Sequence, residues 1–137
     1  MKVTLSYSEN LHFIGSARHF DNIQIDEPET FNGTDLAPSS LEYLFLGIGG
    51  CIGSSFVYCL QKNGIILEKL KIVVDGKLKH TGPKMILEIV NIDVKINFVT
   101  KNRQQEEKID YCKRIFQDYC PALNIMRNPI PLNIRFI

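Results

Sequence analysis

The sequence has almost no excess of charge of either sign. Its 16 lysines and arginines are balanced by 15 aspartates and glutamates. Proteins that bind the phosphate backbone of DNA or RNA carry a clear basic excess, so nucleic acid is not an expected partner. The length of 137 residues fits one domain, residues 1–137, which can bury about two thirds of its unfolded surface without a covalent staple.

The first residues lack the features of a secretory signal. Met1-Lys-Val-Thr-Leu-Ser-Tyr-Ser-Glu9 contains neither a long apolar stretch nor a small-residue cleavage site. This absence favours a cytoplasmic protein, in which thiols start reduced.

The spacing of zinc ligands is also missing, although the chain has four cysteines. Cys51 and Cys59 are eight residues apart, as are Cys112 and Cys120, whereas zinc ligands are usually two to four residues apart. Within one helix, eight residues span about 12 Å. A disulfide needs Cα atoms roughly 4.4 to 6.8 Å apart, so Cys51 cannot pair with Cys59. A pairing of Cys51 with Cys120 stays open, and we interpret Cys59 and Cys112 as core residues.

The N-terminal part of the chain alternates between apolar and polar residues. Lys2–Tyr7, Leu11–Ser16 and Asn22–Asp26 are therefore predicted strands, and polar turns such as Ser8-Glu-Asn10 predict an antiparallel meander. A polar connection follows. Ser39 as N-cap, with Glu42 in the first turn, then predicts a helix that runs to about Asn63.

The second half of the chain predicts a hairpin followed by helices. Leu70–Lys79 and Lys84–Val99 are predicted strands around the turn Thr81-Gly82-Pro83, with the even-numbered residues from Ile86 to Phe98 on one face. Residues 102–119 are amphipathic and predict a helix. Its apolar face consists of Ile109, Cys112, Ile115, Phe116 and Tyr119.

Pro121 permits a further helix to start directly after Cys120. Leu132, Ile134 and Phe136 alternate with polar residues and predict a last strand. The resulting order of elements favours an α+β fold with antiparallel sheet rather than a doubly wound fold.

No charged residue occurs between Tyr43 and Leu60. A run of this length meets the criterion for a membrane span, but its glycines, serines and tyrosines favour a helix buried in the core, so no membrane is expected. Gly47, Gly50, Cys51 and Ser54 share one side of this helix and predict close approach by another helix, from this chain or a second subunit. A nucleotide-binding loop is excluded because the glycines miss the required spacing and no Lys-Ser/Thr follows.

A cysteine in such a helix is most often a small core residue. Burial raises the pKa of a thiol, and Cys51 lies about three turns from the helix start, beyond the reach of the helix dipole. A reactive Cys51 therefore needs a cation supplied from elsewhere.

Two segments resemble those of the OsmC/Ohr family, the osmotically inducible and organic hydroperoxide resistance proteins. They are Pro38-Ser-Ser-Leu-Glu-Tyr-Leu-Phe-Leu-Gly-Ile-Gly-Gly-Cys51 and Tyr119-Cys-Pro-Ala-Leu123, with the predicted hairpin between them. The resemblance covers nearly the whole chain. It implies an intertwined homodimer in which antiparallel sheets wrap two central helices.

The resemblance also implies a reaction. Cys51 would be the peroxidatic cysteine that reduces organic hydroperoxides through a sulfenic acid, Cys120 would resolve it as a disulfide, and an external dithiol would restore the pair. Phe45, Ile48 and Phe56 would form apolar walls that favour apolar peroxides. No metal, flavin or haem is implied. The alternative is a homodimer that binds a small apolar or thiol-containing ligand without turnover.

An arginine and a glutamate complete the site in that family. Arg18, in the turn after the second strand, is the candidate arginine, and a solvated turn residue is the alternative. Glu42 is the candidate glutamate, although it lies nine residues before Cys51 rather than the ten of the hydroperoxide-resistance branch. Its alternative role is to stabilise the helix start. Weaker candidates are Arg103, Arg114, Arg127 and Arg135, and His12, His19 and His80 show no catalytic pattern.

Overall fold

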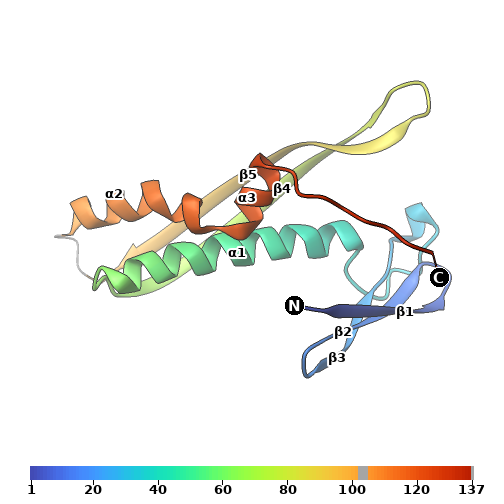
Figure 1. Ribbon diagram of the computed structural model, residues 1–137, viewed down its shortest axis with the longest axis horizontal. Helices are drawn as coiled ribbons and strands as arrows, with labels where there is room; N and C mark the ends of the chain where they lie inside the picture. Colours follow the sequence, from blue (N-terminus) through green and yellow to red (C-terminus); the bar gives the residue numbers. More distant parts are fainter. Residues whose placement is uncertain (102–104, 137) are drawn as a thin grey trace. The chain divides into compact units, whose positions relative to one another are not determined.

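The computed structural model describes residues 1–101 and 105–136, which form two compact units, Met1–Leu44 and Phe45–Ile137 (Figure 1). The boundary between the units falls in the first turns of helix α1 (Ser40–Lys62). The expectation of one domain stays a prediction.

The first unit is the predicted antiparallel meander. Strands β1 (Val3–Glu9), β2 (His12–Ala17) and β3 (Phe20–Ile25) pair in that order. Asn10 and Arg18 occupy the two turns with positive φ angles of 46° and 58°. This conformation is tolerated best by glycine, asparagine and aspartate, so Asn10 suits its turn better than Arg18 does.

The connection from β3 to α1 is organised by a buried carboxylate. Asp26 is fully buried and accepts hydrogen bonds from the backbone N–H groups of Thr34 and Leu36 and from the Thr34 hydroxyl. The Thr34 side chain contributes most to holding the Asp26 pKa below its usual value, since these donors favour the charged form. A short 3₁₀ turn, η1 (Glu29–Phe31), lies within this loop.

Helix α1 begins and ends where the sequence predicts. The Ser39 N–H donates to Glu42 Oε2 at 2.7 Å and the Glu42 N–H donates to Ser39 Oγ at 3.3 Å, which is a capping box. At the other end Gly64 has a φ angle of 71°, and the Ile65 N–H bonds to the Leu60 carbonyl at 2.9 Å. This Schellman arrangement needs a left-handed residue, which explains the glycine.

The second unit contains the predicted hairpin, with longer strands. Strand β4 (Leu67–Thr81) pairs antiparallel with β5 (Ile86–Thr100), and Gly82 has a φ angle of 67° in the turn. The even-numbered face predicted for β5 is confirmed from Ile92 to Phe98, which pack against the core, but it does not extend back to Ile86 and Glu88. The pairing passes from Asn91 opposite Lys77 to Ile89 opposite Leu78, so Val90 is an extra, bulged residue that reverses the faces.

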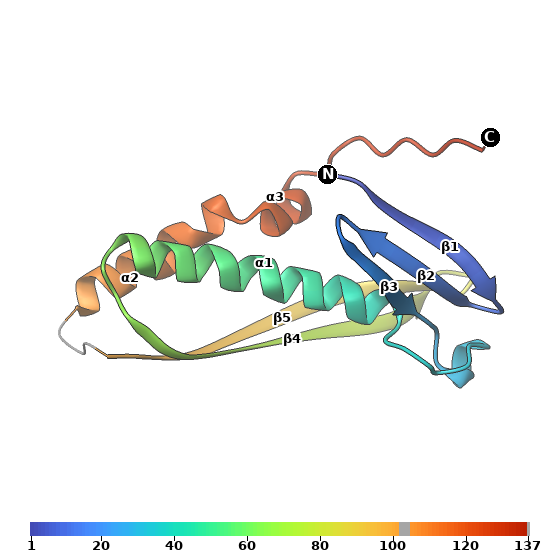
Figure 2. The ribbon, with the colours of Figure 1, turned by 90° about the horizontal axis from the view of Figure 1, so that it is seen from below.

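Helix α1 runs along this hairpin, and α2 and α3 lie alongside α1 (Figures 1 and 2). An added Cβ at Gly49 would lie 3.1 Å from Val74, and one at Gly53 would lie 2.9 Å from Ile72. These two glycines therefore let the helix approach β4 closely. The core consists of Ile48, Ile52, Phe56, Cys59, Leu60, Ile65, Ile109, Cys112, Phe116 and Cys120.

Within the described part of this chain, no other helix covers the glycines of the predicted stripe of small residues, and a helix from a second subunit stays a prediction. Neither Gly47 nor Gly50 has a described atom within 4 Å of an added Cβ. Cys51, on the same side, is covered by the segment that carries Cys120. The α1 glycines that do make close contacts are Gly49 and Gly53, and the element that packs on α1 at these positions is the strand β4.

The predicted helix over residues 102–119 is shorter than expected in its described part. Helix α2 (Glu106–Ile115) leads into a 3₁₀ turn, η2 (Phe116–Tyr119), and residues 102–104 lie outside the described residues. Cys112 and Phe116 are buried as predicted, but Tyr119 is 72% exposed. The change to three residues per turn in η2 rotates Tyr119 away from the buried face. Helix α3 (Pro121–Arg127) starts at the predicted proline.

The predicted last strand is absent from the described residues. After α3 the chain is irregular up to residue 136 (Figure 1), and Leu132, Ile134 and Phe136 are all exposed. Apolar alternation shows that a segment is suited to a sheet, but a strand also needs a partner for its backbone groups. Neither described sheet provides that partner.

By length and composition, α1 is also the one described helix that is apolar enough to cross a membrane. A third of its most apolar 18-residue window is buried within this chain. Core helices of water-soluble proteins pass the same test.

Candidate functional site

Two thiols that are far apart in the sequence meet in the second unit. Cys120 Sγ lies 3.4 Å from Cys51 Sγ, close enough for its S–H to donate to that sulfur. Cys120 is fully buried and Cys51 is partly buried, and both are free cysteines. Only a small movement separates this contact from a disulfide, which requires about 2.05 Å between the sulfurs.

The local sequence explains how Cys120 reaches this position. Pro121 is the first residue of α3, and Cys120 caps the helix in an extended conformation, as a residue before proline prefers. On its other side, the buried Phe116 anchors η2 against Phe56, with the ring centroids 5.4 Å apart. Cys120 is therefore fixed between an anchored turn and a new helix.

Burial raises the pKa of the Cys51 thiol, which makes desolvation the dominant influence on it. The backbone N–H of Ala122 opposes this by stabilising the thiolate, while the neighbouring Cys120 raises the pKa further. No cation contributes among the described residues of the second unit. With these contacts alone, Cys51 is mostly a neutral thiol at neutral pH.

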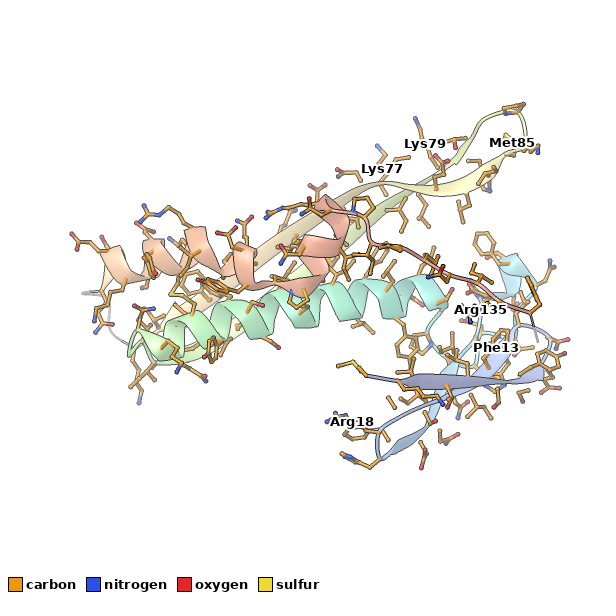
Figure 3. The ribbon with its side chains drawn as sticks, viewed as in Figure 1. Phe13, Arg18, Lys77, Lys79, Met85 and Arg135 are labelled. Carbon is orange, nitrogen blue, oxygen red and sulfur yellow. A yellow bond between two sulfur atoms is a disulfide. The ribbon has the colours of Figure 1, made fainter. Side chains whose placement is uncertain are left out.

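Arg18 and Glu42 both belong to the first unit. Arg18 projects from the β2–β3 turn (Figure 3), with its guanidinium carbon 5.3 Å from the centroid of the Phe20 ring. Glu42 is held by the capping box, and the hydrogen bond from the Ser39 backbone is the main reason that the Glu42 pKa is lowered. The described contacts of Arg18 are thus those of a turn residue, and those of Glu42 stabilise the start of α1.

The weaker arginine candidates have other surroundings. Arg114 is exposed on α2, Arg127 donates to Gln117 Oε1 at 2.7 Å, and Arg135 lies in the extended tail (Figure 3). Arg103 lies outside the described residues.

The residues expected to form apolar walls pack in the described core or against β4. Ile48 and Phe56 are 3% and 1% exposed and belong to the core, and Phe45 packs on Gly76 of β4. The strong apolarity of this helix stretch thus reflects core packing. The described residues form a groove of about 820 Å³ beside the C-terminal half of α1. It is lined by Ser54, Ser55, Tyr58, Cys59, Lys62, Asn63, Tyr111, Ile115 and Tyr119.

A second cysteine pair was missed by the sequence interpretation. Cys59 and Cys112 are buried, as expected of core residues, but they are also joined as a disulfide with their Cα atoms 5.6 Å apart. The missed signal is the equal spacing of eight in both segments. Two segments that run antiparallel can form two such pairs only if the spacings match.

Among residues 1–101 and 105–136, no group of three or more His, Cys, Asp or Glu side chains is placed to hold a metal ion. The chemistry that the described cysteines offer is two-electron thiol and disulfide exchange.

A family model described as OsmC-like protein matches residues 33–135. No curated protein matches the chain in sequence. The matched range includes both Cys51 and Cys120.

Several solved structures share the fold. An OsmC-like protein from Mycoplasma pneumoniae superposes with a TM-score of 0.77 at 18% identity, over 93% of this chain and 87% of that one. The organic hydroperoxide resistance protein OsmC of Legionella pneumophila gives 0.64 at 16% identity, over 93% and 88%. The organic hydroperoxide resistance protein OhrB of Bacillus subtilis gives 0.61 at 17% identity, over 93% and 90%. At these identities the likeness establishes the fold.

Proposed function

Because the chain belongs to the OsmC-like protein family, we propose that it is a thiol-dependent peroxidase that reduces organic hydroperoxides at Cys51. The observation that carries the proposal is the 3.4 Å separation of the Cys51 and Cys120 sulfurs. A fully buried thiol in contact with a more accessible one is the arrangement that a resolving and a peroxidatic cysteine need.

The reaction has two steps. The Cys51 thiolate attacks the distal oxygen of the hydroperoxide, the O–O bond breaks, and the alkoxide leaves as the alcohol after taking a proton. Cys51 is now a sulfenic acid. The Cys120 sulfur then attacks the Cys51 sulfur, water leaves, and a disulfide forms. An external dithiol returns two electrons and two protons to the pair.

Replacing Cys120 by serine tests this order of steps. We expect Cys120→Ser to react once with cumene hydroperoxide but to lose steady turnover with dihydrolipoamide by roughly tenfold or more, because an intramolecular thiol is far better placed than a dissolved one. Intact mass should then show Cys51 with one or two added oxygen atoms. A variant that turns over at the wild-type rate would show that Cys120 does not resolve Cys51.

We further propose that Arg18 activates Cys51, since the contacts of the second unit alone raise the thiol pKa. A guanidinium near the thiol would lower that pKa by about one unit or more. The rate of alkylation by iodoacetamide rises with pH until the thiol is fully ionised, so Arg18→Gln should move the profile of Cys51 about one pH unit upward. Identical profiles for wild type and Arg18→Gln would remove Arg18 from the site. A role for Glu42 at the thiol stays a prediction.

The proposed active form is a homodimer. Support comes from apolar surface that this chain leaves uncovered, including Leu46 on α1 and Leu132 and Ile134 in the tail, each more than 60% exposed. The open faces of Gly47 and Gly50 add to it.

A homodimer that binds a small apolar or thiol-containing ligand without turnover is the second candidate. It is favoured by the raised pKa of Cys51, which disfavours a reactive thiolate. Peroxide consumption distinguishes the two candidates, because a binding protein would reduce no more peroxide than its own thiols allow, even with a dithiol present.

A further inference from the structure

A second thiol pair lies along the same helix interface. We propose that the Cys59–Cys112 disulfide is a reversible redox site, which small dithiols reduce and their disulfides oxidise. While it is oxidised it holds the segment that carries Cys120 against α1, and we call this link the clamp. Nothing in the peroxidase proposal uses these two residues. They are joined as a disulfide across a sequence separation of 53 residues.

The two pairs form an antiparallel ladder. One pair is Cys51 with Cys120, and the other is Cys59 with Cys112. Cys59 lies eight residues after Cys51, and Cys112 lies eight residues before Cys120. The disulfide therefore fixes α2 to α1 directly upstream of the resolving thiol. Between the two rungs, Phe116 is the buried residue that keeps η2 against the core.

Of the two sulfur-bearing residues, Cys59 is the one that borders the groove among the described residues. Cys59 lines the groove described above and is 8% exposed, whereas Cys112 is fully buried. Lys62 lines the same groove, and its ammonium lies 5.4 Å from the centroid of the Tyr58 ring. A thiolate that enters the groove thus meets a cation in the same lining that carries Cys59. The Cys112 sulfur is left as the leaving group.

Asn63 is placed to assist that departure. Its Nδ2 lies 3.5 Å from Cys112 Sγ and 3.7 Å from Cys59 Sγ, and it donates to the Cys59 carbonyl at 2.9 Å. An N–H directed at a sulfur stabilises the thiolate that forms there. The carbonyl contact holds the amide in position.

The exchange balances with a dithiol as reductant. Its thiolate attacks Cys59 Sγ, the Cys59–Cys112 bond breaks, and the electron pair leaves on Cys112, which takes up a proton. The second thiol of the reductant then attacks the reductant sulfur that is bonded to Cys59, and Cys59 leaves as a thiol. The reductant becomes a cyclic disulfide and the protein gains two electrons and two protons. The reverse sequence closes the site.

The consequence for Cys120 rests on the proposed peroxidase function. A closed clamp holds Cys120 in contact with Cys51, so the sulfenic acid is resolved before a second peroxide reaches it. An open clamp frees α2 and η2, and a severalfold larger share of Cys51 should be oxidised to sulfinic acid.

The redox site is tested without Cys51 and Cys120. Full-length Cys51→Ser/Cys120→Ser protein is equilibrated with mixtures of reduced and oxidised dithiothreitol, alkylated and peptide-mapped. We expect Cys59 and Cys112 to change together, from both alkylated to mutually cross-linked, in one two-electron transition. Thiols that remain alkylatable in oxidised dithiothreitol, or a cross-link that persists in excess reduced dithiothreitol, would overturn the proposal. Peptide-resolved alkylation of wild type gives the same readout if the double variant does not fold.

Entry of the reductant through the groove is tested with a separate variant. Lys62→Gln should slow reduction of the Cys59–Cys112 bond by roughly threefold at low salt, with the difference lost at high salt because an exposed charge is screened. Gln61→Ala, a neighbouring exposed change outside the groove, is the matched control. Equal rates for wild type and Lys62→Gln at low salt would overturn entry beside Lys62.

The coupling is read from Cys59→Ser/Cys112→Ser. After treatment with cumene hydroperoxide, this variant should contain the larger share of Cys51 sulfinic acid, and a share equal to that of wild type would overturn the clamp. The peroxidase proposal fails by a different result, namely equal peroxide loss for wild type and Cys51→Ser. That result leaves the dithiothreitol titration unaffected.

Discussion

Replacing Cys51 by serine is expected to reduce hydroperoxide turnover at least about a thousandfold, because a serine hydroxyl is not ionised at neutral pH and cannot replace a thiolate as nucleophile. The change removes little volume from the contact with Cys120. The fold should therefore persist, which circular dichroism and thermal unfolding can check. The measurement is the loss of cumene hydroperoxide in the presence of dihydrolipoamide.

The exposed Gln61, on the same helix, provides the control. Gln61→Ala should keep wild-type turnover. If Cys51→Ser retained most of the activity while the control was normal, the reaction would not proceed through Cys51, and the function as a binding protein would be favoured.

Phe56→Ala is expected to have the largest effect on stability. Phe56 is 1% exposed, and its ring lies edge-on to Phe98 at 5.1 Å and to Phe116 at 5.4 Å. Truncating a buried phenylalanine costs about 3–5 kcal/mol through lost burial and the cavity that remains. Whole domains are stable by only about 5–15 kcal/mol, so this is a large fraction of the total.

Urea denaturation should show the loss as a lower midpoint at an unchanged slope. Because Phe116 anchors the turn before Cys120, the variant should also form the Cys51–Cys120 bond more slowly. Gln61→Ala should shift the free energy of unfolding by less than about 0.5 kcal/mol. A loss below about 1 kcal/mol for Phe56→Ala would mean that the three rings do not form the core described above.

The elements that the sequence predicts well are those with local signals. Ser39 and Glu42 cap their own helix, Gly64 ends it, and Gly82 turns the hairpin, so each needs only a few neighbouring residues. The family resemblance drawn from the segments around Cys51 and Cys120 is confirmed by the match over residues 33–135.

The features that were missed or wrong depend on partners distant in sequence. The bulge at Val90 is visible only in the pairing with Lys77 and Leu78, and the tail around Ile134 has strand alternation but no described strand to pair with. The Cys59–Cys112 bond needs the antiparallel packing of α1 and α2. The proposed activation of Cys51 by Arg18 would likewise depend on a residue distant in sequence, so no local pattern around Cys51 could predict it.

The most direct test of the account is the fate of the two thiols after one equivalent of cumene hydroperoxide. Reduced wild-type protein is treated, quenched by alkylation and digested without reductant, and its peptides are identified by mass. We predict a cross-linked peptide that joins Cys51 to Cys120, formed within one chain and absent from Cys51→Ser and Cys120→Ser. Recovery of Cys51 and Cys120 as alkylated thiols, with the peroxide unconsumed, would contradict the account.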